Sequence, residues 1–393
     1  MRVFIAGVDG YLGWSLSMYL AKRGHQVSGA DNYLRRDWVR EMGSQSATPI
    51  RKMTERLEVF HENFGKNLQF FKGDFTDYGF VEDIFKHVRP EVIVHLGEMP
   101  SAPYSMVDVR HATWTQTNNI VGTLNMLYAM RDVCSGSHMV KLGTMGEYGT
   151  PNIDIPEGFF EIEYRGRKDC LPFPRQANSW YHQSKVHDSN NVMMACRLWN
   201  LCSTDIMQGV VFGTRIDEMG DDERLQTRLD FDQSFGTVIN RFCCQAVIGE
   251  PISPYGMGHQ KRGFLPLRDS MQCLTIAIEN PPKAGEYRVF NQFEEVYDIT
   301  ELACKVKKVG KKLGLNVEVK NLENPRSELE DHYFNPDHQH LLDLGYKPTH
   351  DVEKEIEVMM QDLIKCKDRI EARREALIPD IRWDGRREKV DYL

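Results

Sequence analysis

The sequence predicts an α/β protein in which a doubly wound parallel sheet is joined to a smaller mixed α/β lobe. Three observations support this prediction. Short apolar runs alternate with amphipathic helix patterns through the first half of the chain, a glycine-rich turn follows the first run, and the alternation stops after residue 212. We therefore expect a first domain over residues 1–212, a second lobe mainly over 213–350 with some segments returning to the first domain, and a C-terminal helical extension over 351–393.

Composition excludes several classes of protein. The chain has 393 residues with 41% hydrophobic content, enough for the large core of two lobes. A net charge of −8 argues against a nucleic-acid binder, which would show a basic face. No apolar run approaches the roughly 20 residues of a membrane span, so we expect a cytoplasmic protein. Nine scattered cysteines without paired spacing predict free thiols in a reducing compartment and no metal site.

The first strand, helix and second strand form a unit typical of dinucleotide binding. Residues 3–6 are apolar and lead into the turn Gly7-Val8-Asp9-Gly10-Tyr11-Leu12-Gly13, and a second strand over 26–30 ends at Asp31. Glycines let the backbone approach a pyrophosphate at the helix N-terminus, while the carboxylate accepts hydrogen bonds from ribose hydroxyls. This unit predicts a Rossmann-type domain that binds NAD, with contacts from Gly7, Gly10, Tyr11, Leu12, Gly13, Asp31 and Asn32.

The choice between NAD and NADP depends on the end of the second strand. Asp31 favours NAD, because a 2′-phosphate there would meet a negative charge. Arg35 and Arg36 follow closely and would suit the extra phosphate, although two arginines in a solvated loop need no ligand. We expect NAD, with Arg35 among its contacts.

Three further strands bring polar residues to the same edge of the sheet. They are expected over residues 68–73, 92–96 and 139–142, separated by helices over 81–88 and 118–133. Asp74 ends the first of these strands, where it would meet the adenine amino group or simply form a turn. From these strand and helix ends we assign Asp74, Phe75, Leu96 and Asn118 to the cofactor.

The stretch Ser179-Trp180-Tyr181-His182-Gln183-Ser184-Lys185 supplies the candidate catalytic pair. On a helix, Tyr181 and Lys185 share one face, and a nearby cation favours the phenolate. Read alone, this is an ordinary amphipathic pattern, and Thr144 at the end of the fifth strand is an ordinary turn residue. On one sheet edge with a nicotinamide they form a triad: Thr144 bonds the substrate oxygen, Tyr181 takes its proton, and Lys185 holds Tyr181 and the nicotinamide ribose.

The second half supplies candidate substrate contacts. Strands are expected over 205–212 and 287–291, and helices over 236–248, 270–278, 300–313 and from 352. Arginine binds phosphate oxygens through two parallel hydrogen bonds, so Arg262 and Arg326 are candidates to hold a diphosphate, although most single arginines are merely solvated. The residues we assign to the substrate are Ser101, Thr144, Met145, Gln208, Arg241, Arg262, Asn291 and Arg326.

The glycine turn, Asp31, Thr144 and the Tyr181/Lys185 pair resemble the extended short-chain dehydrogenase/reductases, which act on nucleotide sugars. Longer motifs narrow the resemblance to the UDP-sulfoquinovose synthase family. They cover residues 101–106, 140–154, 181–188, 208–211, 289–293 and 324–326, so the resemblance extends over nearly the whole chain. Without a plastid-type leader, the sequence is most similar to a prokaryotic member.

The resemblance implies a reaction between UDP-glucose and sulfite with tightly held NAD, in a homo-oligomer. Oxidation at C4 gives a ketone that acidifies the C5 hydrogen, the 6-hydroxyl leaves as water, sulfite adds at C6, and the hydride returns to C4. A closed site must keep the reactive intermediate from water. The second lobe is expected to provide that closure.

Two roles in this reaction stay open at the level of sequence. In related sugar dehydratases, Asp-Glu comes directly after the threonine, whereas this chain has Met145 and Gly146 at those positions. We therefore expect either Glu147 or His182 to supply the acid/base function. Each of the two residues is equally consistent with a structural role. Met145 is uncharged and would not repel sulfite. Plant members carry an arginine where this chain has Pro100, which leaves Arg110 or His182 for the sulfite contact.

Two other functions fit part of the pattern. A UDP-sugar 4-epimerase or 4,6-dehydratase uses the same C4 oxidation but needs no sulfite. A non-catalytic NAD-binding scaffold would retain the fold, yet Thr144, Tyr181 and Lys185 together speak against it.

Overall fold

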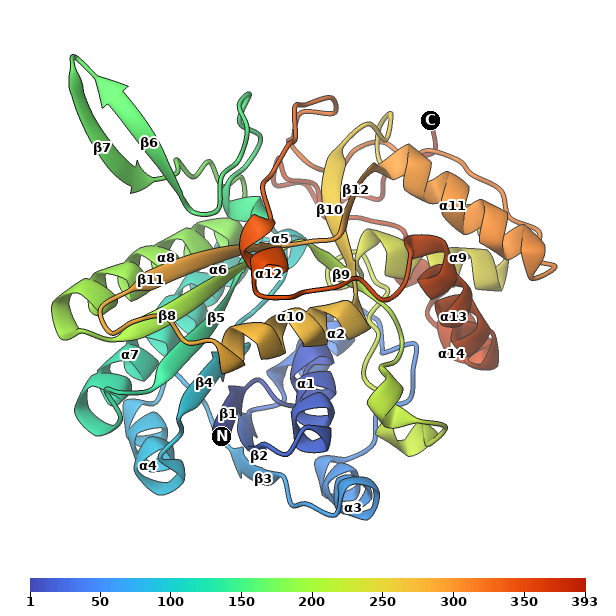
Figure 1. Ribbon diagram of the computed structural model, residues 1–393. Helices are drawn as coiled ribbons and strands as arrows, with labels where there is room; N and C mark the ends of the chain where they lie inside the picture. The colour runs from blue at the N-terminus through green and yellow to red at the C-terminus, as the bar shows by residue number, and fades with distance from the viewer.

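The computed structural model describes residues 1–393 and is built on one seven-stranded parallel sheet (Figure 1). The strand order is β11-β8-β5-β4-β1-β2-β3. From β1 the chain adds β2 and β3 on one side and then β4, β5, β8 and β11 on the other, which is the doubly wound arrangement predicted from the sequence. Its strands are β1 (Arg2–Ala6), β2 (Gln26–Asp31), β3 (Gln69–Lys72), β4 (Val92–His95), β5 (His138–Thr144), β8 (Cys202–Gln208) and β11 (Tyr287–Gln292).

Helices cover both faces of this sheet because successive strand residues point to opposite sides. Val3 and Ile5 of β1 pack with α1, α3 and α10, whereas Phe4 and Ala6 pack with α4, α7 and α8. The helices of this domain are α1 (Tyr11–Lys22), α2 (Leu34–Glu41), α3 (Met53–Phe64), α4 (Tyr78–Val88), α5 (Ala102–Ser105), α6 (Val109–Gln116), α7 (Gly122–Val133), α8 (Trp180–Trp199) and α10 (Leu267–Glu279).

The second lobe contains a three-stranded sheet, β12-β10-β9, and a separate helical core. Its elements are β9 (Val210–Phe212), α9 (Val238–Ile248), β10 (Lys261–Pro266), β12 (Glu295–Asp298), α11 (Ile299–Lys312), α13 (Val352–Lys365) and α14 (Lys367–Glu371). The short helix α12 (Gln339–Asp343) returns to the first domain and packs against β11 of the large sheet. The buried face of α13 shares one apolar core with α9 and α11. Much of the segment expected as a C-terminal extension is therefore packed into this lobe, while the boundary at residue 212 stays a prediction.

The register of the large sheet brings distant residues to one edge. Ala6 pairs with His95, so the turn after β1 lies beside the end of β4, and Thr144 pairs with Gln208 at the end of β8. The carboxyl ends of parallel strands meet at this edge, which is where ligands bind in such sheets.

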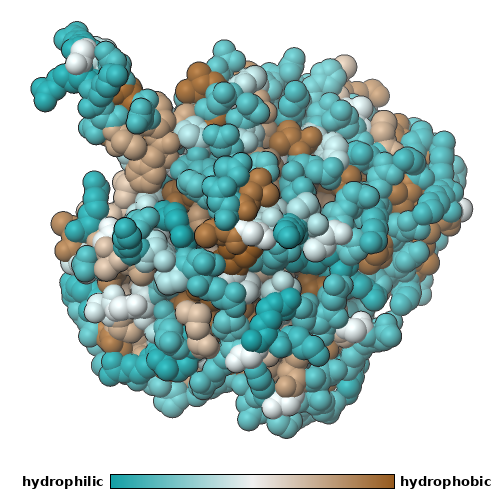
Figure 2. Space-filling model, in the orientation of Figure 1, coloured by the Kyte–Doolittle hydropathy of each residue, from teal (hydrophilic) through white to brown (hydrophobic).

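Several sequence expectations about elements were wrong. Residues 205–212 form two strands in different sheets, because the chain crosses at Gly209, where a Cβ would lie 2.6 Å from the carbonyl oxygen of Gly263. The helix expected from residue 118 starts at Val109, with a π-helical stretch at Thr117–Val121 that leads into α7. An antiparallel hairpin, β6 (Phe159–Tyr164) and β7 (Arg167–Pro172), was not predicted and projects from the body (Figures 1 and 2).

No helix combines the length and the apolar composition that crossing a membrane requires.

Candidate active site

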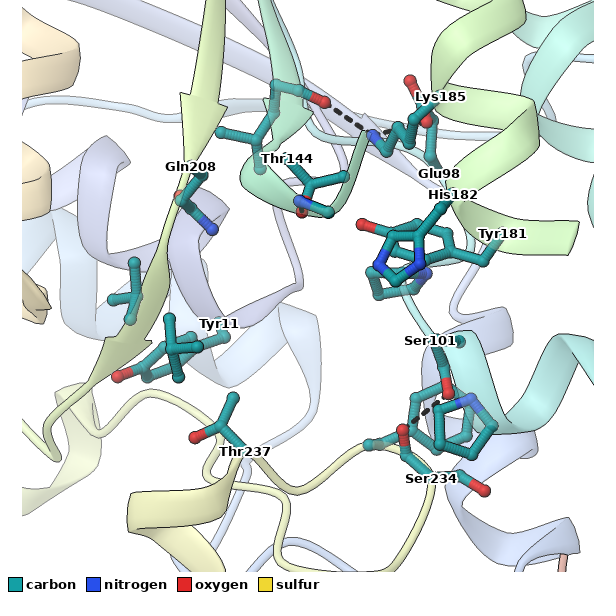
Figure 3. Close-up of a pocket in the computed structure, with 18 of the residues that line it drawn as sticks. Tyr11, Glu98, Ser101, Thr144, Tyr181, His182, Lys185, Gln208, Ser234 and Thr237 are labelled. Atoms are coloured by element: carbon teal, nitrogen blue, oxygen red, sulfur yellow. Dashed lines mark hydrogen bonds and ion pairs between the residues drawn. The ribbon is translucent and has the colours of Figure 1, made fainter. Parts of the chain in front are cut away.

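A cavity of about 480 Å³ lies between the carboxyl edge of the large sheet and the second lobe. Its walls include the turn after β1, the ends of β4, β5 and β8, the start of α8, and residues of the second lobe. Figure 3 shows Tyr181, His182 and Lys185 from α8 on one side of this space, with Thr144 and Gln208 across from them. The cavity therefore gathers residues that are far apart in the sequence.

The turn after β1 leaves room for a pyrophosphate next to the start of α1. A Cβ on Gly13 would lie 2.2 Å from the carbonyl oxygen of Gly7, and Gly7 itself has a φ of +83°. Gly10 caps α1 without a side-chain hydrogen bond, so the first amides of the helix can bind an anion. These residues fit the diphosphate of NAD.

Asp31 lies at the ribose end of the same turn. Its carboxylate accepts hydrogen bonds from the backbone N–H groups of Asp9 (3.0 Å) and Tyr33 (2.7 Å). Burial, with the neighbouring Asp9 carboxylate, raises the pKa of Asp31 to about 6. This arrangement keeps an acceptor on the cavity wall, as NAD requires and a 2′-phosphate would oppose.

The two arginines after Asp31 already have carboxylate partners. Arg35 lines the cavity but donates to Asp230 at 2.9 and 2.8 Å, and Arg36 donates to both oxygens of Asp9 at 2.7 Å. Ion pairs at both positions leave little free charge for an extra phosphate. The other residues assigned to the cofactor, Tyr11, Leu12, Asn32, Asp74, Phe75, Leu96 and Asn118, also line the cavity.

The start of α8 positions the Tyr/Lys pair. Ser179 caps the helix and its hydroxyl accepts from the N–H of His182, while the N–H of Tyr181 donates to the hydroxyl of Ser105 at 3.0 Å. One turn later, Lys185 Nζ donates to the carbonyl oxygen of Leu142 at 2.6 Å. Thr144, Tyr181 and Lys185 all line the cavity, so the fold brings the predicted triad together.

A buried ion pair changes the electrostatics expected for this pair. Lys185 Nζ lies 2.5 Å from Oε2 of Glu98, and both side chains are almost fully buried. Burial and the charge of Glu98 raise the pKa of Tyr181 above its ordinary value. The sequence predicts that a nearby cation favours the phenolate; in the protein, burial and the Glu98 carboxylate outweigh Lys185, so the pKa of Tyr181 is raised.

Glu147, one of the two candidate acid/base residues, does not line the cavity. It lies fully buried in a network of charges, with Arg175 Nη1 at 2.6 Å and Lys141 Nζ at 3.6 Å. Its Oε1 also accepts from the backbone N–H of Thr144 at 3.3 Å, which completes a capping box at the end of β5. Glu147 therefore fixes the position of Thr144, and a direct role in acid/base chemistry does not fit its place.

His182, the other candidate, lies on the cavity wall. Its Nδ1 is 2.9 Å from the hydroxyl of Ser179, and its Nε2 is directed towards Gly146, where a Cβ would lie 2.4 Å away. Burial, aided by the positive charges of Arg326 and Arg262, lowers the pKa of His182 to about 3. The imidazole is thus neutral at physiological pH, and the same burial and positive charges make it a weak base.

The residues assigned to the substrate line the cavity, with one exception. Ser101, Met145, Gln208, Arg241, Arg262 and Arg326 face it. Asn291 does not, because its amide is occupied by the hydroxyl of Tyr148 (2.9 Å) and the carbonyl oxygen of Asp337 (2.7 Å). Arg110 is exposed and outside the cavity, so of the two sulfite candidates only His182 is near the site.

Sequence reasoning missed several cavity residues. No role was predicted for Glu98, Arg228 or Tyr255, although all three line the cavity. Asn119 supports the site from behind, since its side chain bonds both backbone groups of Met99 and the hydroxyl of Ser184. The π-helical stretch that carries Asn119 is a feature common at functional sites.

Comparisons with known proteins agree with this geometry. The model of the NAD dependent epimerase/dehydratase family matches residues 3–291. UDP-sulfoquinovose synthase of Sulfolobus acidocaldarius is 47% identical over 98% of each chain. The chloroplastic UDP-sulfoquinovose synthase of Spinacia oleracea is 45% identical over 97% of this chain and 79% of its own.

Solved structures show the same fold. UDP-glucose 4-epimerase of Thermotoga maritima, solved with UDP-glucose, superposes with a TM-score of 0.70 at 20% identity, over 93% of this chain and 99% of that chain. The 4-epimerase of Thermus thermophilus with NAD gives 0.65 at 21% identity, over 92% and 99%. This chain belongs to the NAD dependent epimerase/dehydratase family and, within it, to the UDP-sulfoquinovose synthases.

Proposed function

We propose that this chain converts UDP-glucose and sulfite into UDP-sulfoquinovose, with NAD⁺ regenerated in each cycle. The observation that carries the proposal is the convergence of Thr144, Tyr181 and Lys185 with the glycine turn in one cavity, which is also lined by three arginines (Arg241, Arg262 and Arg326). The reaction of a nucleotide sugar needs both kinds of contact: catalytic groups beside the cofactor for the sugar, and positive charges for the diphosphate. Similarity to UDP-sulfoquinovose synthases over nearly the full chain supports the choice of reaction.

The oxidation at C4 uses the triad. NAD⁺ held by the glycine turn and Asp31 would supply the reversible acceptor for the C4 hydride. Tyr181 takes the proton of the 4-hydroxyl, and the hydroxyl of Thr144 donates a hydrogen bond to the same substrate oxygen. Lys185 stays fixed by Leu142 and Glu98 beside the phenol. These groups make the C4 alcohol and ketone interconvertible.

The steps at C5 and C6 fall to His182. The ketone acidifies the C5 hydrogen, and the neutral imidazole accepts this proton and passes it to the 6-hydroxyl, which leaves as water. The bisulfite form of sulfite then adds to C6 of the resulting enone through sulfur, and its proton returns to C5, so that the step balances. Met145 lines the cavity next to Thr144 without charge, and Glu147 is directed away from it, so no carboxylate from this loop opposes the incoming anion.

The test is a product analysis. Enzyme, UDP-glucose, NAD⁺ and sulfite should yield a nucleotide sugar with a sulfonate in place of one hydroxyl, identified by mass spectrometry. Tyr181→Phe should reduce the rate by roughly 10²- to 10⁴-fold, the range for a lost acid/base group. If UDP-glucose were converted at the same rate with and without sulfite, and without a sulfonate in the product, the proposal would be refuted and an epimerase or dehydratase indicated. A homo-oligomer and a cytoplasmic location stay predictions.

A further inference from the structure

The C-terminal segment returns to the candidate active site. It folds back on itself, with the N–H of Val390 donating to Pro379, and runs beside residues 321–325. The N–H of Glu323 donates to the carbonyl of Asp391, and the N–H of Trp383 donates to that of Pro325 at 2.8 Å. The end of the chain lies on the side of the molecule that carries β10 and α11 (Figure 1). These bonds hold Trp383 at the cavity wall.

Trp383 packs against one of the predicted substrate arginines. The guanidinium of Arg326 lies 5.6 Å from the centre of the Trp383 ring and 5.7 Å from that of Tyr255. Both distances are within the range of cation–π attraction, so two aromatic rings orient this guanidinium. Nε of Arg326 has no hydrogen-bond partner, and neither has Nε1 of Trp383, although both atoms are buried.

A buried indole N–H normally finds an acceptor. In the protein the acceptor is missing, and the surrounding wall is positively charged. Arg241 donates to the hydroxyl of Tyr255 and the carbonyl of Ser253, which are neutral groups, and only Arg262 has a carboxylate partner, Glu328 at 2.7 Å. A ligand that suits this wall carries negative charge and several acceptor oxygens.

We propose that the indole N–H of Trp383 donates a hydrogen bond to a diphosphate oxygen of the bound nucleotide sugar, so that the C-terminal segment completes the substrate site. This inference rests on the proposed function only for the class of ligand. Trp383→Phe retains a ring over Arg326 and removes the donor, whereas Trp383→Ala removes both.

The experiment uses UDP as the probe and requires neither sulfite nor turnover. The chain has six tryptophans, so isotope labelling of the indole nitrogen gives few N–H resonances, and Trp383→Phe assigns one of them. UDP should shift that resonance while uridine leaves it in place. By calorimetry, Trp383→Phe should bind UDP about ten-fold more weakly, as expected for a lost hydrogen bond to a charged acceptor.

The matched control is Trp199→Phe. Trp199 lies at the far end of α8 against Tyr128, outside the cavity, and its variant should bind UDP like the parent protein. The proposal would be overturned if the chemical shift of the Trp383 resonance did not change on addition of UDP, or changed equally with uridine. An unchanged affinity of Trp383→Phe for UDP would overturn it as well. If UDP bound as expected but no sulfonate product formed, the proposed function alone would fail.

Discussion

Replacing Glu98 with glutamine should make Tyr181 a stronger acid. In the protein the Glu98 carboxylate lies 2.5 Å from Lys185 Nζ and cancels much of its field. The ammonium is 5.9 Å from the centre of the Tyr181 ring. An uncompensated unit charge at that distance is worth about 2.8 kcal/mol at an effective dielectric constant of roughly 20, or about 2 pKa units. Glu98→Gln should therefore lower the pKa of Tyr181 by up to that amount.

The sign of the effect follows from the role of the phenol. C4 oxidation needs the phenolate, so its rate rises with pH through the pKa of Tyr181, and a lower pKa moves this rise to more acidic pH. The assay is the absorbance of NADH formed in a single turnover with UDP-glucose and no sulfite, measured over a pH series. His95, which lies 3.3 Å from Glu98, does not complicate the profile, because burial lowers its pKa to about 4. Burial and the Glu98 charge raise the pKa of the nearby Asp188, so the same series is also measured for Glu98→Gln combined with Asp188→Asn, which excludes a contribution from Asp188.

Glu91→Gln is the control for this experiment. Glu91 is a surface carboxylate that pairs with Arg2 just before β4, outside the cavity. Its removal should leave the pH profile in place. If Glu98→Gln leaves the midpoint unchanged or moves it to higher pH, Glu98 does not offset Lys185 as argued.

Three other substitutions test the site. Gly13→Ala should weaken NAD binding at least ten-fold by calorimetry, because its methyl would lie 2.2 Å from a carbonyl oxygen of the same turn, while Gly136→Ala, in open space, should not. Lys141→Met should lower the free energy of unfolding in urea by roughly 3–5 kcal/mol, because two buried carboxylates, Glu147 and Asp205, each lose an ion-pair partner. His182→Ala should abolish solvent exchange at C5 of the sugar, whereas Glu147→Gln should retain it; the opposite pattern would exchange their roles.

The parts of the fold that depend on local pattern could be predicted from the sequence. The glycine turn requires close backbone approach, and the spacing of Tyr181 and Lys185 fixes their shared helix face. The break at Gly209 could not be predicted, because both flanking stretches are apolar and β-prone, and only the tertiary fold decides that they enter different sheets. The β6–β7 hairpin was equally hidden, since most of its residues are exposed and show no buried face.

The direction of a side chain at a strand end was the weakest point of sequence reasoning. Glu147 follows the central strand β5 and Asn291 lies near the end of the edge strand β11, yet both side chains are directed into the protein. For Glu147 a signal existed: Thr144 and Glu147 have the spacing of a capping box, in which the carboxylate returns to the backbone of the first residue. No comparable signal marks Asn291, because its partners are distant in the sequence.

The ion pairs of Glu98 and Glu147 support the proposal that His182, and not a carboxylate, carries the proton transfers at C5. A buried carboxylate is tolerated only with partners, and each of these has a cation: Lys185 for Glu98, and Arg175 with Lys141 for Glu147. A proton transfer to either carboxylate would break its ion pair and leave the cations uncompensated in a low-dielectric interior, so neither is suited to carry protons in the reaction. His182 has no such partner and is neutral. It can therefore gain a proton without breaking an ion pair, and in its neutral form it does not repel sulfite.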